Sequence, residues 1–238
     1  MLSYNTTVAV NGQRPSSSNS MSTGHQSIPP SPKTVRLPTS SFSNGIITNG
    51  TSSTPREQHI WLVTGPAGCG KSTVAKHLAD SLQLPFIEGD EYHPKANIEK
   101  MSAGIPLTDA DRWDWLTALR EASIEALDRG HDGVVLTCSA LKRKYRDVIR
   151  VAPYFTPNLH LHFIYLDASE ELLMQRVSAR KNHYMGANMV HSQFEVLERP
   201  KADEVDVITI DVARPLEEVQ AAALDKVLRT MDELRPHA

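Results

Sequence analysis

The sequence predicts an α/β fold, a parallel sheet flanked by helices, and two observations carry this prediction. From residue 57 onward, apolar strand-like runs alternate with helical patterns, which is the order of elements that builds a parallel sheet. The apolar runs are continuous rather than alternating with polar residues, as is typical of strands that are covered on both faces. We therefore expect one layered domain over residues 57–238.

Five runs are predicted as strands because apolar and β-branched residues dominate them. They cover residues 59–64, 85–88, 133–138, 161–166 and 205–210.

Four segments between these runs are predicted as helices, namely residues 72–82, 111–128, 169–179 and 215–234. The second is supported by apolar residues that follow the i, i+4, i+7 spacing of one helix face from Trp115 to Leu127. We expect Asp109 to cap the start of this helix and Ser169 to cap the start of the next one.

Residues 1–56 differ in composition from the rest of the chain. They hold 13 Ser, 8 Thr and 6 Pro and no Asp or Glu, and their few apolar residues show no period. Such a segment buries too little surface to offset its ordering entropy, so we predict a disordered tail before the domain. The Ser-rich, acid-free composition is also that of a transit peptide, although basic residues are few and no amphipathic helix is visible.

The charge balance bears on the partners of the domain. The tail takes four of the 25 basic residues and none of the 28 acidic ones, which leaves 21 basic against 28 acidic residues and a formal charge of −7 for residues 57–238. An acidic domain argues against nucleic acid as a partner. No apolar run is long enough to cross a membrane, and two cysteines, Cys69 and Cys138, fit a reducing compartment. We expect a cytoplasmic protein without membrane contact.

The segment between the first predicted strand and the first predicted helix has the pattern of a phosphate-binding P-loop. Glycines let its backbone curl so that successive N–H groups face a phosphate, and the following helix adds its partial positive charge. Lys71 is placed to reach the β- and γ-phosphates of a nucleotide, and the Ser72 hydroxyl to ligate Mg²⁺. The predicted nucleotide-binding residues are Gly65, Pro66, Ala67, Gly68, Cys69, Gly70, Lys71, Ser72 and Thr73.

Two carboxylates follow the second predicted strand, at the edge where parallel sheets bind their ligands. Beside a P-loop, one of Glu88 and Asp90 can hold the Mg²⁺ shell through water while the other accepts the proton of an attacking hydroxyl. His93 adds a third polar group. The alternative is that both acids only end a strand at the surface. No Asp ends the third predicted strand, where many P-loop ATPases carry one, and this disfavours a motor-type ATPase.

Basic residues lie near the same predicted edge. Arg112 can hold an anionic acceptor through two hydrogen bonds, and Lys142 and Arg146 belong to a basic run after the third strand. Arg176 and Arg180 share one helix face and can neutralise charge on a transferring phosphoryl group. For each of these residues the alternative is an ordinary solvated helix face.

Residues 182–193 are predicted as a mobile lid rather than a long helix, because Asn182, Gly186 and Asn188 favour a loop. A lid suits phosphoryl transfer to an alcohol, since water must be excluded from the reaction.

The domain resembles the small P-loop gluconokinases of the thermoresistant type over roughly residues 59–235. The P-loop alone is common to many kinases, and the specific likeness lies in blocks further along the chain. The most specific of these are His93-Pro94, Asn97-Ile98-Glu99-Lys100-Met101 and Cys138-Ser139-Ala140-Leu141-Lys142, followed by Ser192-Gln193-Phe194-Glu195.

This resemblance implies a fold like that of the nucleoside monophosphate kinases, with an acceptor lobe and a lid, and often a homodimer. It implies ATP and Mg²⁺ as cofactors and D-gluconate as the substrate. The implied reaction turns ATP and D-gluconate into ADP and 6-phospho-D-gluconate, which feeds the pentose phosphate pathway. Glu88 stands where the family pattern has Asp, which leaves Mg²⁺ coordination with a longer reach.

The roles expected from the residues and the resemblance are these. The catalytic residues are Lys71, Asp90, Arg176 and Arg180, with Asp90 as the base; the substrate-binding residues are Asp90, His93, Arg112, Lys142 and Arg146; the metal is held by Ser72 and Glu88. Two rivals stay open: another small-molecule kinase on the same fold, such as a shikimate kinase, and a non-catalytic nucleotide-binding regulator.

Overall fold

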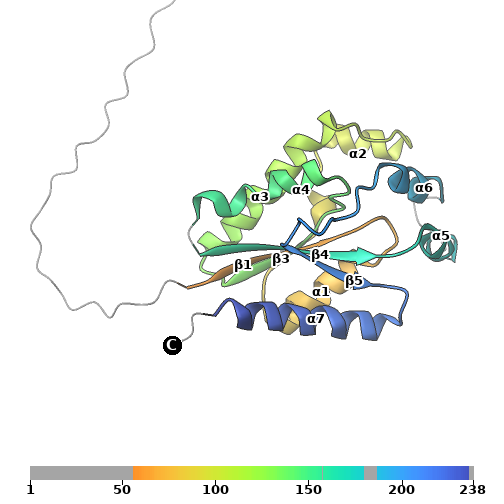
Figure 1. The fold of residues 1–238 in the computed structure, drawn as a ribbon. Coiled ribbons are helices and arrows are strands. Elements are labelled where there is room, and N and C mark those ends of the chain that lie inside the picture. The colour runs from red at the N-terminus through yellow and green to blue at the C-terminus, as the bar shows by residue number, and fades with distance from the viewer. Residues whose placement is uncertain (1–55, 157, 180–186, 236–238) are drawn as a thin grey trace, which may run out of the picture. The chain divides into compact units, whose positions relative to one another are not determined.

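The structure, a computed structural model that describes residues 56–156, 158–179 and 187–235, is built on a five-stranded parallel sheet (Figure 1). The strands lie in the order β2-β3-β1-β4-β5, and every neighbouring pair is parallel. They are β1 (Gln58–Thr64), β2 (Phe86–Ile87), β3 (Gly133–Thr137), β4 (Leu159–Asp167) and β5 (Val207–Asp211). All five predicted strands are confirmed. The predicted tail lies outside the described residues apart from Arg56.

Helices cover both faces of this sheet (Figure 1). On one face lie α1 (Lys71–Leu82) and α7 (Leu216–Glu233), and on the other α3 (Trp113–Asp128) and α4 (Arg143–Ile149). The three remaining α-helices are α2 (Lys95–Ser102), α5 (Glu170–Ala179) and α6 (Ala187–Val196).

The central strand β1 divides the core between the two layers. Trp61 and Val63 pack with buried residues of α1 and α7, whereas Ile60 and Leu62 pack with buried residues of α3. This is the two-residue alternation of a strand with apolar groups on both sides, and it explains the continuous apolar run in the sequence.

The loop conformation predicted for residues 182–193 is wrong for the part that the structure describes, whereas their role as a lid stays a prediction. Residues 187–196 form the helix α6, because Val190 is fully buried in the core and Phe194, one turn later, packs against the same core. Burial of this face outweighs the loop preference of Asn188. Residues 182–186 lie outside the described ranges.

One predicted helix cap is confirmed and the other is wrong. The Leu172 N–H donates to Ser169 Oγ over 3.3 Å at the start of α5. Asp109 precedes a short 3₁₀ turn (Ala110–Arg112) that leads into α3, but its side chain makes no capping hydrogen bond. The carboxylate is instead engaged by three side chains of the segment after β3, as described below.

The strand order brings the carboxyl ends of β1, β3 and β2 side by side. The segments that follow these strands therefore meet at one edge of the sheet. Among the described residues, no helix has the length and apolar content that a membrane span needs.

Candidate active site

The P-loop has the strained, glycine-dependent backbone of a phosphate cradle. Gly68 adopts a φ of +84°, and a Cβ built on it would come within 2.9 Å of Val177 Cγ2 on α5. A side chain at this position is therefore excluded twice, by the left-handed backbone and by the close approach of α5. The helix α1 starts directly behind the loop at Lys71, so its first amides have no partner within the helix and face the loop.

Lys71 lies folded over this loop. Its Nζ donates to the carbonyl oxygens of Gly65 and Pro66, each over 3.1 Å. These two acceptors are neutral, and a phosphate oxygen is a stronger partner for an ammonium group. The lysine is thus held at the mouth of the cradle, where the terminal phosphates of a nucleotide would lie.

Glu88 reaches across to the neighbouring strand. Its Oε1 accepts a hydrogen bond from the Thr137 hydroxyl at the end of β3, and the same hydroxyl accepts the Gly89 N–H over 2.9 Å. The carboxylate therefore lies at the end of β3, the place where the sequence carries no Asp. Glu88, which follows β2, supplies the carboxylate at this position instead.

The turn that carries Asp90 is fixed from two sides. Trp115 Nε1 donates to the Gly89 carbonyl over 2.7 Å, and a Cβ on Gly89 would lie 1.9 Å from the Thr137 carbonyl oxygen. Only glycine allows this approach, so the 3₁₀ turn Gly89–Tyr92 is pressed against the end of β3. Asp90 itself is exposed to solvent.

His93 directly follows the turn that carries Asp90. Its ring is 9% exposed and stacks on Trp115 at 4.0 Å between centroids, and its Nδ1 lies 3.4 Å from the Asn97 amide. Burial lowers the pKa of His93, with Asp90 opposing and Arg112 adding to the effect. The imidazole is therefore neutral near pH 7.

The Cys138 thiol is buried directly after β3. Burial raises the pKa of Cys138 to about 12, and the charges of Lys71, Asp90 and Arg112 affect it less. The thiol stays protonated and is no nucleophile.

Arg112 and Lys142 both lie near the Tyr145 ring. The Arg112 guanidinium donates to the Leu107 and Thr108 carbonyls and lies 5.5 Å from the Tyr145 ring centroid, while Lys142 Nζ lies 5.7 Å from it. Asp109 accepts from Lys142 over 3.0 Å and from Lys144 and Tyr145. These contacts tie the segment before α3 to the segment after β3.

Arg146 does not face this cluster, which corrects its assignment to the substrate. Its side chain is 2% exposed and forms a two-pronged ion pair with Glu204, with both nitrogen–oxygen distances at 2.7 Å. Its remaining nitrogen donates to the Ala140 and Glu198 carbonyls. Arg146 shares the buried face of α4 with Tyr145 and Ile149. The four-residue spacing of Tyr145 and Ile149 is the feature of the sequence that indicates this buried face.

Arg176 lies on the β5 side of the strand-end edge. Its Nη2 donates to the Val212 carbonyl over 2.6 Å, just after β5, and its charge acts on the thiol of Cys69 in the P-loop. Arg180 lies outside the described residues.

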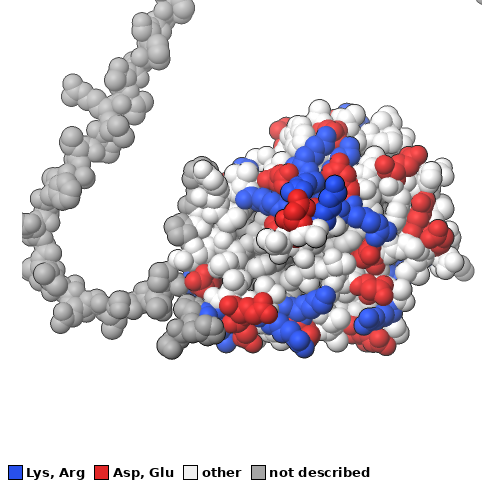
Figure 2. All heavy atoms as spheres, viewed as in Figure 1, with Lys and Arg blue, Asp and Glu red and all other residues white. Residues whose placement is uncertain are grey.

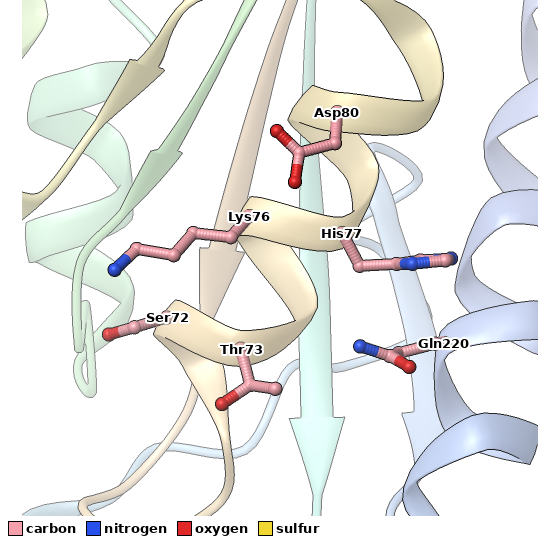
Figure 3. Close-up of a pocket in the computed structure, with 6 residues that line it drawn as sticks. All are labelled: Ser72, Thr73, Lys76, His77, Asp80 and Gln220. Atoms are coloured by element: carbon pink, nitrogen blue, oxygen red, sulfur yellow. The ribbon is translucent and has the colours of Figure 1, made fainter.

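A hollow of about 360 Å³ lies along the exposed flank of α1 (Figure 3). It starts at the P-loop residues Ser72 and Thr73, and Gln220 of α7 closes its far side. Its other lining residues are Lys76, His77 and Asp80.

The charged side chains over α4 are of mixed sign (Figure 2). Arg143 pairs with Asp203 over 2.7 Å, and Arg150 pairs with Asp147 and Asp206. Two residues of the basic run, Arg143 and Arg146, are therefore paired with acids that are distant in the sequence, Asp203 and Glu204.

The donor set fits a magnesium ion that is shared with a nucleotide. Mg²⁺ takes oxygen ligands and usually binds through one or two protein groups plus phosphates and water. The Ser72 hydroxyl at the start of α1 and the Glu88 carboxylate at the end of β3 supply such oxygens. Among the described residues, no cluster of three His, Cys, Asp or Glu side chains forms a complete metal site.

Several residues of the edge make contacts there that the sequence does not predict. Trp115 and Gly89 hold the turn of Asp90, Asp109 binds the lysines, and Gln193 of α6 bonds to the P-loop. Their partners are between 26 and 126 residues away in the chain, so no local pattern reports them.

Comparison with known proteins gives a consistent result. The family model for shikimate kinase matches residues 67–231. The probable gluconokinase of Schizosaccharomyces pombe is 51% identical over 177 residues, which cover 74% of this chain and 91% of that protein. The thermoresistant gluconokinase of Escherichia coli K12 is 42% identical over 176 residues, which cover 74% of this chain and 97% of that protein.

A solved structure agrees with these relatives. The crystal structure of a gluconokinase from Sinorhizobium meliloti 1021 matches with a TM-score of 0.64 and 41% sequence identity, over 75% of this chain and 95% of that chain. The predicted fold class, a P-loop kinase fold with a parallel sheet flanked by helices, is confirmed.

Proposed function

The chain belongs to the gluconokinases within the shikimate kinase-type P-loop family, and on that premise we propose that it transfers the γ-phosphoryl group of ATP to D-gluconate. The products are ADP and 6-phospho-D-gluconate, a substrate of the pentose phosphate pathway. One observation supports this most directly: the turn that carries Asp90 is bonded to Thr137 at the end of β3, and Thr137 lies opposite Val63 of β1 in the sheet. The proposed base therefore lies at the strand-end edge from which the P-loop and Lys71 start.

The P-loop holds the donor in this proposal. Amides of residues 65–73 and the start of α1 surround the phosphates, and Lys71, which donates two of its three N–H groups to the loop carbonyls, directs the third to the β- and γ-phosphates. Ser72 and Glu88 hold Mg²⁺, Glu88 through water, and Thr73 supports the nucleotide. When bound there, the metal would neutralise charge on the phosphates.

Asp90 acts on the acceptor. The carboxylate is exposed at the edge, and its turn is fixed by Trp115 and Gly89, so it can accept the proton of the primary hydroxyl while that oxygen attacks phosphorus. Neutral His93 beside it offers a hydrogen bond to a sugar hydroxyl.

The gluconate carboxylate binds to the cations around Tyr145. Lys142, Lys144 and Arg112 surround that ring, and Asp109 balances one of their charges. An excess of positive charge is left for an anionic acceptor. Arg146 is left out of this set, since its nitrogens are occupied by protein acceptors.

Arg176 and Arg180 stabilise the transferring phosphoryl group from the side of α5. The hydrogen bond from Arg176 to Val212 places the guanidinium at the strand-end edge, and its charge acts on Cys69 of the P-loop.

A cytoplasmic location and a homodimer belong to the same proposal. The location is supported by the two cysteines, both of which are free.

An acceptor screen tests the function. ADP release is measured with ATP and Mg²⁺ in the presence of gluconate, shikimate or glycerate, and with no acceptor. We expect turnover with gluconate alone. Turnover with shikimate instead of gluconate would overturn the gluconate assignment in favour of a shikimate kinase. No acceptor-dependent turnover at all would favour a nucleotide-binding regulator over a kinase.

A further inference from the structure

The Pro66–Ala67 peptide of the P-loop is hydrogen-bonded through both its carbonyl and its N–H group. The Pro66 carbonyl accepts Lys71 Nζ over 3.1 Å, and the N–H on the other side of the same peptide, that of Ala67, donates to Gln193 Oε1 over 2.7 Å. The peptide thus connects the lysine of the loop to a side chain of α6.

This amide needs an acceptor. Ala67 is 7% exposed, and an N–H that is shielded from water without a partner is costly. Within the described part of the chain, Gln193 is the partner that the amide has. The orientation of the Pro66–Ala67 peptide therefore depends on where Gln193 lies.

The fold fixes Gln193 firmly. Val190 and Phe194, on either side of it, pack α6 against the core. Beyond the helix, the Glu198 N–H donates to the Leu141 carbonyl over 2.8 Å, and the Glu198 carboxylate accepts the Arg143 N–H over 2.7 Å. Both ends of the segment around Gln193 are thus anchored, one in the core and one to the segment that leads from β3 into α4.

The neutral charge of the Gln193 side chain suits a position beside the phosphates. A carboxylate would accept the Ala67 N–H more strongly than an amide does. It would also bring a negative charge to a loop that holds phosphates, which costs binding energy. A neutral acceptor orients the peptide without that repulsion.

We propose that Gln193 is a positioning residue for the donor nucleotide: it fixes the Pro66–Ala67 peptide and thereby the place of the Lys71 ammonium at the terminal phosphate. The proposal rests on the proposed function only in taking ATP as the donor. A residue that merely docked α6 would affect folding and not the choice of nucleotide.

Two variants and one control separate these roles. Gln193→Leu removes the acceptor, and Gln193→Glu keeps an acceptor of similar shape but adds charge. Gln175→Glu adds the same charge to an exposed position of the neighbouring helix α5. Binding of ADP and of a non-hydrolysable ATP analogue is measured by titration calorimetry with Mg²⁺, together with melting temperature and the KM values for ATP and gluconate.

We expect Gln193→Leu to weaken binding of the ATP analogue about tenfold, since a shielded amide is left unpaired. Gln193→Glu should keep the melting temperature of the unchanged protein, yet weaken the ATP analogue more than ADP and more than Gln193→Leu does. The KM for gluconate should change in neither variant, and Gln175→Glu should change none of these values.

Equal affinities of Gln193→Glu and the unchanged protein for the ATP analogue would overturn the proposal, as would a loss of melting temperature alone. Failure of the proposed function looks different. In that case the unchanged protein shows no turnover with gluconate, while the order of nucleotide affinities among the Gln193 variants is still measured by calorimetry.

Discussion

The Thr137 hydroxyl donates a hydrogen bond to the Glu88 carboxylate and accepts the Gly89 N–H over 2.9 Å. One hydroxyl at the end of β3 thus places the acid that follows β2. The sequence has no Asp at the end of β3, and this contact shows why none is required for an acid to lie there. It also links the two sides of the edge, since the turn of Asp90 begins at Gly89.

Removing this hydroxyl should affect the metal first. In Thr137→Val, Glu88 loses its donor and the Gly89 N–H loses its acceptor, so we expect the Mg²⁺ concentration at half-maximal activity to rise severalfold. Glu88→Gln should act in the same direction, because it removes the charge. Thr137→Ser keeps the hydroxyl and should behave like the unchanged enzyme. A Mg²⁺ titration at saturating ATP decides, and an unchanged midpoint in both Thr137→Val and Glu88→Gln would remove Glu88 from the metal site.

The ion pair of Arg146 predicts a stability effect rather than a binding effect. Hydrogen bonds from Arg146 lower the pKa of the Glu204 carboxyl to about 2, so the buried acid is charged. Arg146→Met leaves that charge with fewer partners and should cost about 3–5 kcal/mol of the free energy of unfolding.

Urea unfolding measures this cost, and the KM for gluconate should stay unchanged under conditions where the variant is folded. Arg143→Met is the matched control, because Arg143 pairs with Asp203 at an exposed position of the same helix and its loss should barely move the midpoint. A stable Arg146→Met protein with a raised KM for gluconate would return Arg146 to the substrate site.

The parts of the site that the sequence predicts are those encoded within a few residues. The P-loop follows β1 and starts α1, so one strand, one loop and one helix start define it. Continuous apolar runs likewise identified β1 and β3, because both faces of these strands are buried. Local patterns carry this information since short-range backbone geometry determines it.

The remaining contacts depend on packing between distant segments. Arg146 and Lys142 look alike in the basic run, yet one lies on the buried face of α4 and the other at its start. The helix α6 was mistaken for a loop because its stability comes from Val190 and Phe194 against the core rather than from its own propensity. The contacts of Asp109 and Gln193 are not predicted for the same reason: their partners are far away in the chain.

Lys71→Ala should reduce kcat/KM for ATP by roughly a hundredfold or more, the usual cost of removing a group that stabilises transferred charge. Within the described ranges, the side chain bonds only to the Gly65 and Pro66 carbonyls, so we expect little change in melting temperature. Lys76→Ala, one turn further along α1 and exposed, is the control and should keep most activity. Loss of melting temperature in Lys71→Ala that matches its loss of activity would speak for a structural role.

Stability should fall in mild acid because of stacked histidines at the amino end of the sheet. Burial, with neighbouring imidazoles adding to it, lowers the pKa of His59 and of His162 to about 4 each. Glu57 opposes this effect at His59 and Asp206 at His162. The unfolded chain binds protons at these groups near pH 6.5 and the folded chain does not, so stability rises with pH between about 4 and 6.5.

Each imidazole contributes up to about 3 kcal/mol to this difference. Unfolding free energies measured at pH 7.5, 6.0 and 5.0 should therefore decrease in that order. His162→Phe should flatten the dependence, whereas His131→Phe, at an exposed position, should leave it unchanged. A pH dependence that survives intact in His162→Phe would assign it to other groups.

Asp90→Asn tests the base directly. Asparagine keeps the shape and a hydrogen-bond acceptor for the gluconate hydroxyl but cannot take its proton, so kcat should fall by about 10²–10⁴ while the KM for gluconate rises far less. The turn itself should persist, because Trp115 and Thr137 hold Gly89 rather than the Asp90 side chain. Glu91→Gln, at the next exposed position, removes one charge without touching the proposed base and should keep near-normal kcat. If Asp90→Asn also kept near-normal kcat, proton transfer would lie elsewhere, and Asp90 would be reduced to orienting the acceptor.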